Sequence, residues 1–464
     1  MLKKNDIITL NIEDLTNLGF GVGRAASGIV VFVSDAVIGD VCSVRIIKCN
    51  KSFAVGRVEK FIKKSEIRCD GRCPITACKS CTYRHVSYHE ELKIKRDSVK
   101  SAFMHEGLSD IEILDTVPSP TETGYRNKAQ YPVSRDKSGN YIIGFYAPKS
   151  HRVTEARNCP LAPPVFAKIL DTVAAFFKKH DISVYNEESG EGLIRHIYLR
   201  RGEISCEVLL TLVINGTSIP AEDELCAIIK EKHPEIVGLL INENTDATNV
   251  VLGDKFRTLF GRDYIFDTLG GVRLKITAPS FYQVNRGAAD LLYAEAKRLA
   301  APKKTDRLLD LYCGAGSIGL SMADEVGELI GIEIIDSAVE CATYNARENG
   351  ITNAKFYTGD AKNTENLLAN AEKELSRKIE PTVVILDPPR AGCAKELIEY
   401  VARLAPDRIV YVSCNPQTLA RDVKIFAQLG YTAGEVKTFD LFPMTGHVES
   451  VVCLTHTFDV DMRH

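Results

Sequence analysis

The chain has 464 residues, of which 45% are hydrophobic and 26% are charged, and its formal net charge is −3. These values are typical of a folded protein of two to four domains, and they exclude an overall basic field that would attract nucleic acid. No apolar run reaches the roughly 18 residues that a membrane span needs, and the N-terminal residues lack the apolar core of a signal peptide. We therefore expect a cytoplasmic monomer with no membrane partner.

Residues 1–64 alternate short apolar runs with Gly and Asp, which predicts short strands that close or half-close into a small barrel. This segment contains ten Lys and Arg residues against six Asp and Glu residues. The local excess of positive charge suggests contact with a polyanion, although a solvated positive face fits it about equally well.

Residues 65–275 mix strand-like and helix-like patterns without a repeat, and they predict a central α+β domain. Residues 86–107 have helical apolar spacing and end at a Gly, and this helix packs either here or on the domain that follows. The segment 124–131, G-Y-R-N-K-A-Q-Y, alternates basic and aromatic residues. Arg126 and Lys128 can bind RNA phosphates while the rings stack on unpaired bases, but a strand with one solvated face gives the same pattern.

Four cysteines fall close together after the first domain, and Cys159 follows in R-N-C-P-L. The spacing Cys73-x4-Cys78-x2-Cys81 fits neither one face of a strand nor one face of a helix, so a structural metal explains it better than free thiols do. Four thiolates bind either zinc or a [4Fe–4S] cluster. The spacing leaves open whether Cys69 or Cys73 is the first ligand.

Residues 276–464 alternate strand-like and helix-like runs, which predicts a doubly wound, Rossmann-like α/β fold with helices on both faces of a parallel sheet. Ligands bind such sheets outside the carboxyl ends of the strands. The first strand runs into a loop where Gly314, Gly316 and Gly319 match G-x-G-x-x-G before a helix. Glycines let the backbone approach a ligand closely, and the helix start offers free N–H groups. The loop therefore fits a dinucleotide or S-adenosylmethionine.

Acidic residues follow the next three strands. Glu333 lies 17 residues after Gly316, where an acid can bind ribose hydroxyls, and Asp360 falls on the same rim. Asp387 begins D-P-P-R, which is a rigid loop at the end of the fourth strand. Dehydrogenases do not need such a loop, whereas methyltransferases that act on bases commonly carry one. The pattern therefore favours methyl transfer over nicotinamide redox chemistry.

Cys414 follows the next strand in S-C-N-P, so we expect its thiol to open on the same crevice. Methylation of C5 in a pyrimidine needs a thiolate that adds to C6, and then a base that removes the C5 proton so that the thiol can leave. Glu449 is the candidate base and His447 a second candidate. The target base must be flipped out of its stack to reach the pocket. Cys393 is a competing nucleophile, but its separation from Asp387 favours a structural role.

Together these motifs resemble those of the RNA uracil-5 methyltransferases that depend on S-adenosylmethionine. The resemblance spans nearly the whole chain and rests on F-Y-Q-V-N, L-D-L-Y-C-G-A-G, I-G-I-E, D-P-P-R, S-C-N-P and H-V-E-S-V, in family order. It implies that Cys414 is the nucleophile and Glu449 the general base. The implied cofactor site, with the two loop glycines, consists of Gln283, Tyr312, Gly314, Gly316, Glu333, Asp360 and Asp387. Gln283 has no signal apart from the resemblance.

Residues 1–64 resemble the TRAM domain, a small OB-like RNA-binding barrel. Ribosomal-RNA members of the family carry a [4Fe–4S] cluster, which implies the ligands Cys73, Cys78, Cys81 and Cys159 and a structural role for the cluster. Transfer-RNA members typically lack both the barrel and the cluster. We therefore expect a 23S rRNA (uracil-C5)-methyltransferase with a TRAM barrel at 1–64, a central RNA-binding domain at 65–275 and a catalytic domain at 276–464. The alternatives are a tRNA uracil-5 methyltransferase and a non-catalytic RNA-binding ribosome assembly factor.

Overall fold

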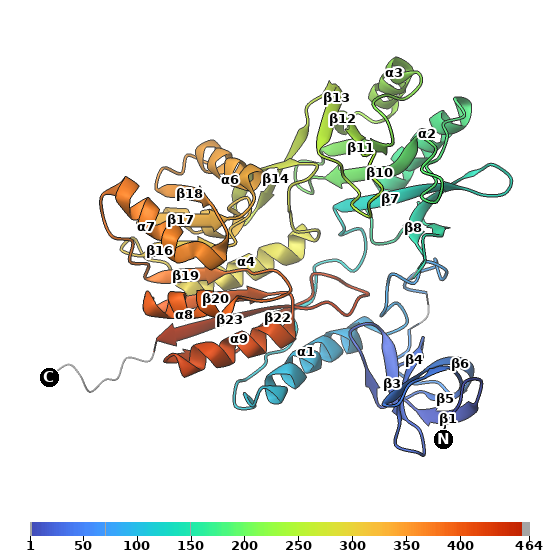
Figure 1. Ribbon diagram of the computed structural model, residues 1–464, viewed down its shortest axis with the longest axis horizontal. Coiled ribbons are helices and arrows are strands. Elements are labelled where there is room, and N and C mark those ends of the chain that lie inside the picture. Colours follow the sequence, from blue (N-terminus) through green and yellow to red (C-terminus); the bar gives the residue numbers. More distant parts are fainter. Residues whose placement is uncertain (1, 70, 149, 457–464) are drawn as a thin grey trace.

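The computed structural model describes residues 2–69, 71–148 and 150–456, which form three lobes in chain order (Figure 1). The N-terminal lobe is a six-stranded sheet with the order β1-β5-β6-β4-β3-β2, which matches the predicted barrel-like architecture. Alternate residues of its strands are buried and enclose one hydrophobic cluster. Its strands are β1 (Ile7–Asn11), β2 (Asp14–Leu15), β3 (Phe20–Arg24), β4 (Val30–Ser34), β5 (Val41–Cys49) and β6 (Phe53–Lys63).

The helix α1 (Tyr88–His105) follows the cysteine-rich segment and lies along α9 (Pro416–Gln428) of the C-terminal lobe (Figure 1). Val99 and Phe103 of α1 are buried in the same hydrophobic cluster as Leu419 and Phe426 of α9. An early segment of the chain therefore covers the outer face of the last lobe.

The central lobe is a seven-stranded sheet with the order β13-β12-β11-β10-β7-β8-β9. Its strands are β7 (Lys128–Arg135), β8 (Tyr141–Tyr146), β9 (Val153–Glu155), β10 (Ile194–Arg201), β11 (Val208–Ile214), β12 (Ile236–Glu243) and β13 (Lys255–Gly261). The helices α2 (Pro164–Lys179) and α3 (Glu222–Lys232) cover one face, and apolar side chains of α2 pack on β10 and β11. This lobe has its own core.

The C-terminal lobe opens with the hairpin of β14 (Tyr264–Leu269) and β15 (Val272–Thr277), followed by α4 (Arg286–Ala300). The hairpin and α4 share one hydrophobic cluster with the catalytic sheet. That sheet has the order β18-β17-β16-β19-β20-β23-β21, and β22 pairs with β23. Its strands are β16 (Arg307–Leu311), β17 (Glu328–Glu333), β18 (Ala354–Thr358), β19 (Val383–Leu386), β20 (Arg408–Ser413), β21 (Tyr431–Ala433), β22 (Lys437–Phe439) and β23 (Glu449–His456).

The five strands from β18 to β20 are mutually parallel, as the sequence predicts for a Rossmann-like fold. The prediction of a parallel sheet is wrong on the side beyond β20, because β23 runs antiparallel to β20. Residues of β19 are buried on both faces, which explains their unbroken apolar run. The remaining helices are α5 (Ser317–Leu320), α6 (Asp336–Glu348), α7 (Thr364–Leu375), α8 (Lys395–Arg403) and the 3₁₀ turns η1 (Ala323–Glu325) and η2 (Ala361–Asn363). Among the described residues, no helix is both long enough and apolar enough to cross a membrane.

Candidate active site

The carboxyl ends of β16, β17, β19 and β20 lie at one edge of the catalytic sheet, in adjacent positions. The glycine loop follows β16, and its backbone has left-handed φ angles at Tyr312 (64°), Gly314 (55°) and Gly316 (79°). A Cβ atom on Gly316 would lie 3.0 Å from Leu320 and 3.2 Å from the Phe356 ring. The positive φ angle and the lack of space for a side chain therefore both require a glycine at position 316.

Two carboxylates hold the glycine loop in place. The backbone N–H of Gly319 donates to Asp310 over 3.0 Å, and burial raises the pKa of Asp310 to about 8. Glu333 at the end of β17 accepts from the N–H groups of Gly314 and Ile335, each over 3.0 Å. The predicted ribose-binding acid therefore lies directly against the glycine loop. Asp360 lies at the end of β18, where its side chain accepts from the backbone N–H of Lys362 and begins η2.

Gln283 reaches this crevice from the segment before α4. Its side chain is buried, and its hydrogen bond to Tyr293 lowers the raised pKa of that phenol, whose main shift comes from burial. The Tyr293 hydroxyl also lies 2.8 Å from the Ser317 hydroxyl at the start of α5. Asn285 caps α4 by accepting from the N–H of Ala288. Sequence reasoning gave no role to Tyr293, which stands in no motif, or to Asn285, although Asn285 ends the F-Y-Q-V-N motif.

Cys414, Glu449 and Asp387 converge beyond the strand ends. Ser413 of β20 pairs with Ser450 of β23, so Cys414 and Glu449 lie next to each other at the same edge. Burial, and then the charges of Glu449 and Asp387, raise the pKa of the half-buried Cys414 thiol to about 11. Burial and Asp387 likewise raise the pKa of Glu449, which is 6% exposed. Burial raises the pKa of Asp387 to about 7.

Arg390 supplies the positive charge of this group. Its charge lowers the pKa values of Cys414, Glu449 and His447, although burial has the larger effect on each of them. The Arg390 side chain is exposed, while its carbonyl accepts from the Asn415 side chain over 2.8 Å. Sequence reasoning quoted this residue in D-P-P-R but gave it no role. An arginine that follows a strand-end acid was the available signal.

The other two sequence candidates lie at the margin of this group. His447 is exposed, and its ring lies 5.7 Å from that of Phe442. Cys393 is buried, and its backbone N–H donates to Asp422 of α9 over 2.8 Å. Burial raises the pKa of Cys393 to about 12. The Cys393 side chain packs in the same hydrophobic cluster as Leu419 and Phe426 of α9.

The loop 440–447 leads into Glu449 and is held by buried charges from α1. Lys95 donates to Asp440 over 2.6 Å and to Glu91 over 2.8 Å, and all three side chains are fully buried. Glu91 also accepts from the backbone N–H of Met444 over 2.7 Å. The hydroxyl of Tyr125, from the central lobe, donates to the carbonyl of Pro443 over 3.0 Å. Two other parts of the chain thus fix the approach to Glu449.

Arg126 and Lys128 lie at the start of β7, beside this loop. Within the described part of the chain, the Nε of Arg126 is buried without a hydrogen-bond partner. Burial, together with the charges of Arg200 and Arg126, lowers the pKa of Lys128 to about 8. Lys128 stands opposite Arg200 in the β7–β10 pair. Arg126, Lys128 and Arg200 therefore form a group of neighbouring cations at the start of β7.

The predicted cysteine ligands lie near one another. Cys81 donates a hydrogen bond that lowers the pKa of Cys73 to about 6. Burial raises the pKa of Cys159, and the nearby charges of Cys78 and Cys73 raise it further. Cys73, Cys81 and Cys159 pack in one cluster with Met444 of the 440–447 loop. Across residues 2–69, 71–148 and 150–456, no group of three or more His, Cys, Asp or Glu side chains is arranged to hold a metal ion. The structure therefore does not support the metal cluster that the spacing predicts.

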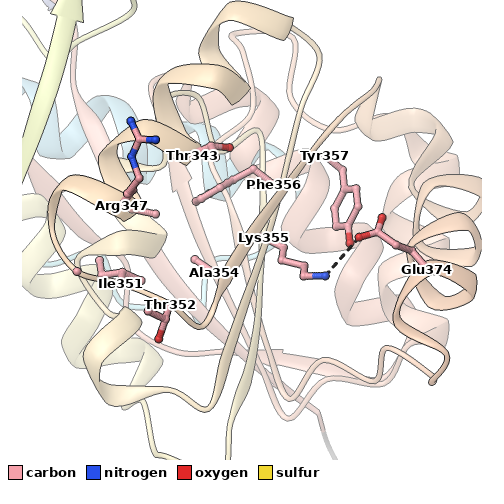
Figure 2. Close-up of a pocket in the computed structure, with 11 residues that line it drawn as sticks. Thr343, Arg347, Ile351, Thr352, Ala354, Lys355, Phe356, Tyr357 and Glu374 are labelled. Carbon is pink, nitrogen blue, oxygen red and sulfur yellow. Dashed lines mark hydrogen bonds and ion pairs between the residues drawn. The ribbon is translucent and has the colours of Figure 1, made fainter.

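A cavity of about 650 Å³ lies elsewhere on the catalytic lobe (Figure 2). Thr343 and Arg347 of α6 line one side, and Lys355 and Tyr357 of β18 line the other, where Lys355 pairs with Glu374. This cavity lies between α6 and the edge strand β18, whereas the site residues predicted from the sequence lie at the carboxyl ends of the strands. The convergence of charged side chains, and not the size of a cavity, locates the candidate site.

Comparisons with known proteins identify the family of this chain. Residues 87–457 match the model of the tRNA (Uracil-5-)-methyltransferase family, and residues 2–58 match the TRAM domain. The chain belongs to the tRNA (uracil-5-)-methyltransferase family. It is an RNA methyltransferase of this family with a TRAM domain at its N-terminal side.

Relatives and a solved structure cover nearly the whole chain. An uncharacterized RNA methyltransferase of Clostridium acetobutylicum is 38% identical over 98% of this chain and 98% of its own length. Another from Clostridium tetani is 36% identical over 99% of this chain and 98% of its own. The crystal structure of the Pyrococcus abyssi tRNA (uracil-54, C5)-methyltransferase in complex with S-adenosyl-L-homocysteine is 27% identical, with a TM-score of 0.77. It covers 97% of this chain and 100% of its own.

Proposed function

We propose that this protein transfers a methyl group from S-adenosylmethionine to C5 of a uridine in RNA. The observation that carries the proposal is the convergence of Cys414, Glu449 and Asp387 beyond the strand ends that also hold the glycine loop. Membership of a uracil-5 methyltransferase family supports the reaction, and a related structure with S-adenosyl-L-homocysteine supports the methyl donor.

Cys414 is the nucleophile and Glu449 the base in this proposal. The Cys414 thiolate forms a bond to C6 of the uracil, and the electron pair of the C5–C6 double bond moves to make C5 nucleophilic. S-adenosylmethionine supplies the electrophilic methyl group. Glu449 then takes the C5 proton, the double bond re-forms and the thiolate leaves. Burial of Glu449 favours this step, because it raises the carboxylate's affinity for a proton.

The residues around the glycine loop hold the methyl donor. Gly314 and Gly316 admit a ligand close to the backbone, and Glu333 beside them suits ribose hydroxyls. Gln283, Tyr312, Asp360 and Asp387 complete the proposed site around the same crevice. Arg126 and Lys128 bind phosphates of the substrate. Among the described residues, the Nε of Arg126 has no hydrogen-bond partner and Lys128 has no acidic partner, so both cations are available for phosphates.

We propose 23S rRNA as the substrate, on the strength of the TRAM domain and the clustered cysteines. A tRNA uridine is the second candidate, and one observation favours it. The Pyrococcus abyssi tRNA enzyme covers 97% of this chain, so a tRNA enzyme can share this whole architecture. Membership of a family of methyltransferases argues against a purely non-catalytic assembly factor.

Cys73, Cys78, Cys81 and Cys159 would hold a [4Fe–4S] cluster, which suits four thiolates. These thiols lie near one another, but no described group of three or more is arranged as a metal site, so the assignment rests on their spacing in the sequence. Bound here, a cluster would supply no chemistry to methyl transfer and would fix the segment that packs on Met444. Iron and sulfide analysis of the anaerobically purified protein tests the assignment. Zinc in place of iron, or no metal, would contradict it.

Unmodified transcripts of 23S rRNA and of tRNAs from the same cells, incubated with labelled S-adenosylmethionine, test the proposed substrate. We expect 5-methyluridine in 23S rRNA and background levels in tRNA. Label in tRNA alone would replace the first substrate with the second. Label in neither, under conditions where S-adenosylhomocysteine binds, would contradict the proposed reaction.

A further inference from the structure

A hollow of about 500 Å³ lies on the central lobe, at the end of its sheet where β10 finishes and β12 begins. Arg201 lines it from the end of β10, and Gly124 lines it from the loop before β7. Lys168 lines it from α2, and Lys232 lines it from the end of α3. The hollow belongs to the central lobe and is separate from the crevice of the catalytic sheet. The proposed reaction gives it no task.

The hollow has an excess of positive charge. Lys168 and Lys232 are exposed, and within the described residues neither forms an ion pair. The Arg201 guanidinium donates to the Cys206 sulfur over 3.2 Å. One carboxylate, Glu235, lies in the lining, and it accepts from the His233 ring over 3.2 Å. Three cationic side chains therefore line the hollow, against one carboxylate that already accepts a hydrogen bond.

The start of α2 adds to this positive potential. Pro163, Pro164 and Val165 line the hollow, so the first turn of this 16-residue helix opens into it. Among the residues that the structure describes, no side chain caps this helix start, and the first turn contains no acidic residue. The partial positive charge of a helix N-terminus favours anions. The helix therefore reinforces the charge of Lys168 and Arg201.

Short connections link the hollow to the active site. The N–H of Arg201 donates to the carbonyl of Asn127 over 2.8 Å, and the Asn127 side chain donates to the carbonyl of Gln283 over 2.8 Å. Arg200 precedes Arg201 and points to the opposite face of the strand, towards Ser280. Arg200 is 1% exposed, and its Nη1 is buried without a partner among the described residues. Arg200 and Arg201 therefore place cations on both faces of the sheet at the end of β10.

We propose that the hollow formed by Lys168, Arg201 and Lys232 binds backbone phosphates of the RNA strand that leads away from the target uridine. The proposal rests on the proposed function for the direction of the strand, but the binding itself requires only RNA. Cations without ion pairs suit phosphates, which fix the position of an RNA without reading its sequence. In the proposed function Arg126 and Lys128 bind the strand nearer the target, and the hollow extends that contact past the end of β10.

The test is the salt dependence of RNA binding by the full-length double variant Lys168→Ala/Lys232→Ala. The probe is a uridine homopolymer of about 30 nucleotides, which is single-stranded and independent of the true substrate. Loss of two phosphate contacts should reduce the slope of log K against log salt by about 1.4 and weaken binding about tenfold near physiological salt. S-adenosylhomocysteine affinity should be unchanged.

Lys137→Ala/Lys178→Ala is the matched control, since both lysines are exposed on the same lobe outside the hollow. Lys178 lies ten residues further along α2 than Lys168, or about 15 Å away, which exceeds the screening length. An unchanged slope in the first variant, or an equal change in both, overturns the proposal. A reduced slope in a protein that methylates no RNA would contradict the proposed function and leave this binding site standing.

Discussion

Cys414 and Glu449 lie side by side at the end of the β20–β23 ladder, where Ser413 pairs with Ser450. The charge of Glu449 raises the pKa of the Cys414 thiol, after the larger effect of burial. A nucleophile and a base this close can act on neighbouring atoms of one uracil ring. The thiol adds to C6 in the first step, and the base takes the proton from C5 in the last.

The variant Glu449→Gln should retain adduct formation and lose turnover. Glutamine has nearly the same shape but cannot take the C5 proton, so the thiol cannot leave. We expect multiple turnover to fall by about 10²- to 10⁴-fold while a covalent protein–RNA complex accumulates on a denaturing gel. Turnover close to that of the wild-type enzyme would show that another group, such as His447, is the base.

The reactivity of Cys414 should rise with pH in the ligand-free protein. Burial, Glu449 and Asp387 raise the pKa of the Cys414 thiol to about 11, so its thiolate forms only at alkaline pH. Alkylation by iodoacetamide, followed by peptide mass spectrometry, should therefore have a midpoint near this pKa. Glu449→Gln removes a negative charge and should lower the midpoint. Arg390→Ala removes a positive charge and should raise it, and shifts in the reverse directions would refute the assigned geometry.

Asp387 should make the ligand-free protein less stable at neutral pH. Burial raises the pKa of Asp387 to about 7, while the unfolded value is about 3.9. The unfolded chain therefore loses this proton first, and stability falls as pH rises from about 4 to 7. Asp387→Asn should raise Tm by about 1–4 °C at pH 7.5 and by less at pH 5, while it reduces activity. Asp324→Asn, at an exposed position, is the control, and equal effects would argue against desolvation of the Asp387 carboxyl.

Lys95 should matter both to stability and to catalysis. Lys95→Met leaves Asp440 as an uncompensated buried carboxylate, while Glu91 keeps its ion pair with Arg72, and the loss costs about 3–5 kcal/mol in the free energy of unfolding. The same loss frees the 440–447 loop that leads to Glu449. Lys93→Met on the same helix removes only an exposed pair with Glu90, worth about 0–1 kcal/mol. Urea unfolding compares the two, and equal losses would show that the buried network carries no special weight.

The strand ends of the catalytic sheet could be predicted from sequence, because strands buried on both faces give unbroken apolar runs. The glycine loop, Glu333, Asp387 and Cys414 follow such runs directly, and the structure places all four at one edge. The position of Glu449 could not be derived in this way, since β23 returns antiparallel to β20 and the run of β23 does not show its direction.

Contacts between distant segments left no pattern in the sequence. Lys95 and Asp440 are separated by 345 positions, and nothing in the periodicity of α1 marks one lysine as buried. Arg201 and Lys168 likewise meet only because strand ends and the start of α2 share one sheet edge. The cysteine spacing predicted proximity, which the structure shows among the described thiols, but their arrangement around a metal is not seen there.

The identity of the nucleophile is tested most directly by trapping it on RNA. A 23S rRNA transcript that contains 5-fluorouridine in place of uridine cannot lose a proton from C5, so the adduct persists through denaturation and proteolysis. Peptide mass spectrometry of the trapped complex should find the nucleotide on Cys414, and Cys414→Ala should form no complex while Cys393→Ala forms it normally. A nucleotide on Cys393, or a stable complex with Cys414→Ala, would contradict Cys414 as the nucleophile.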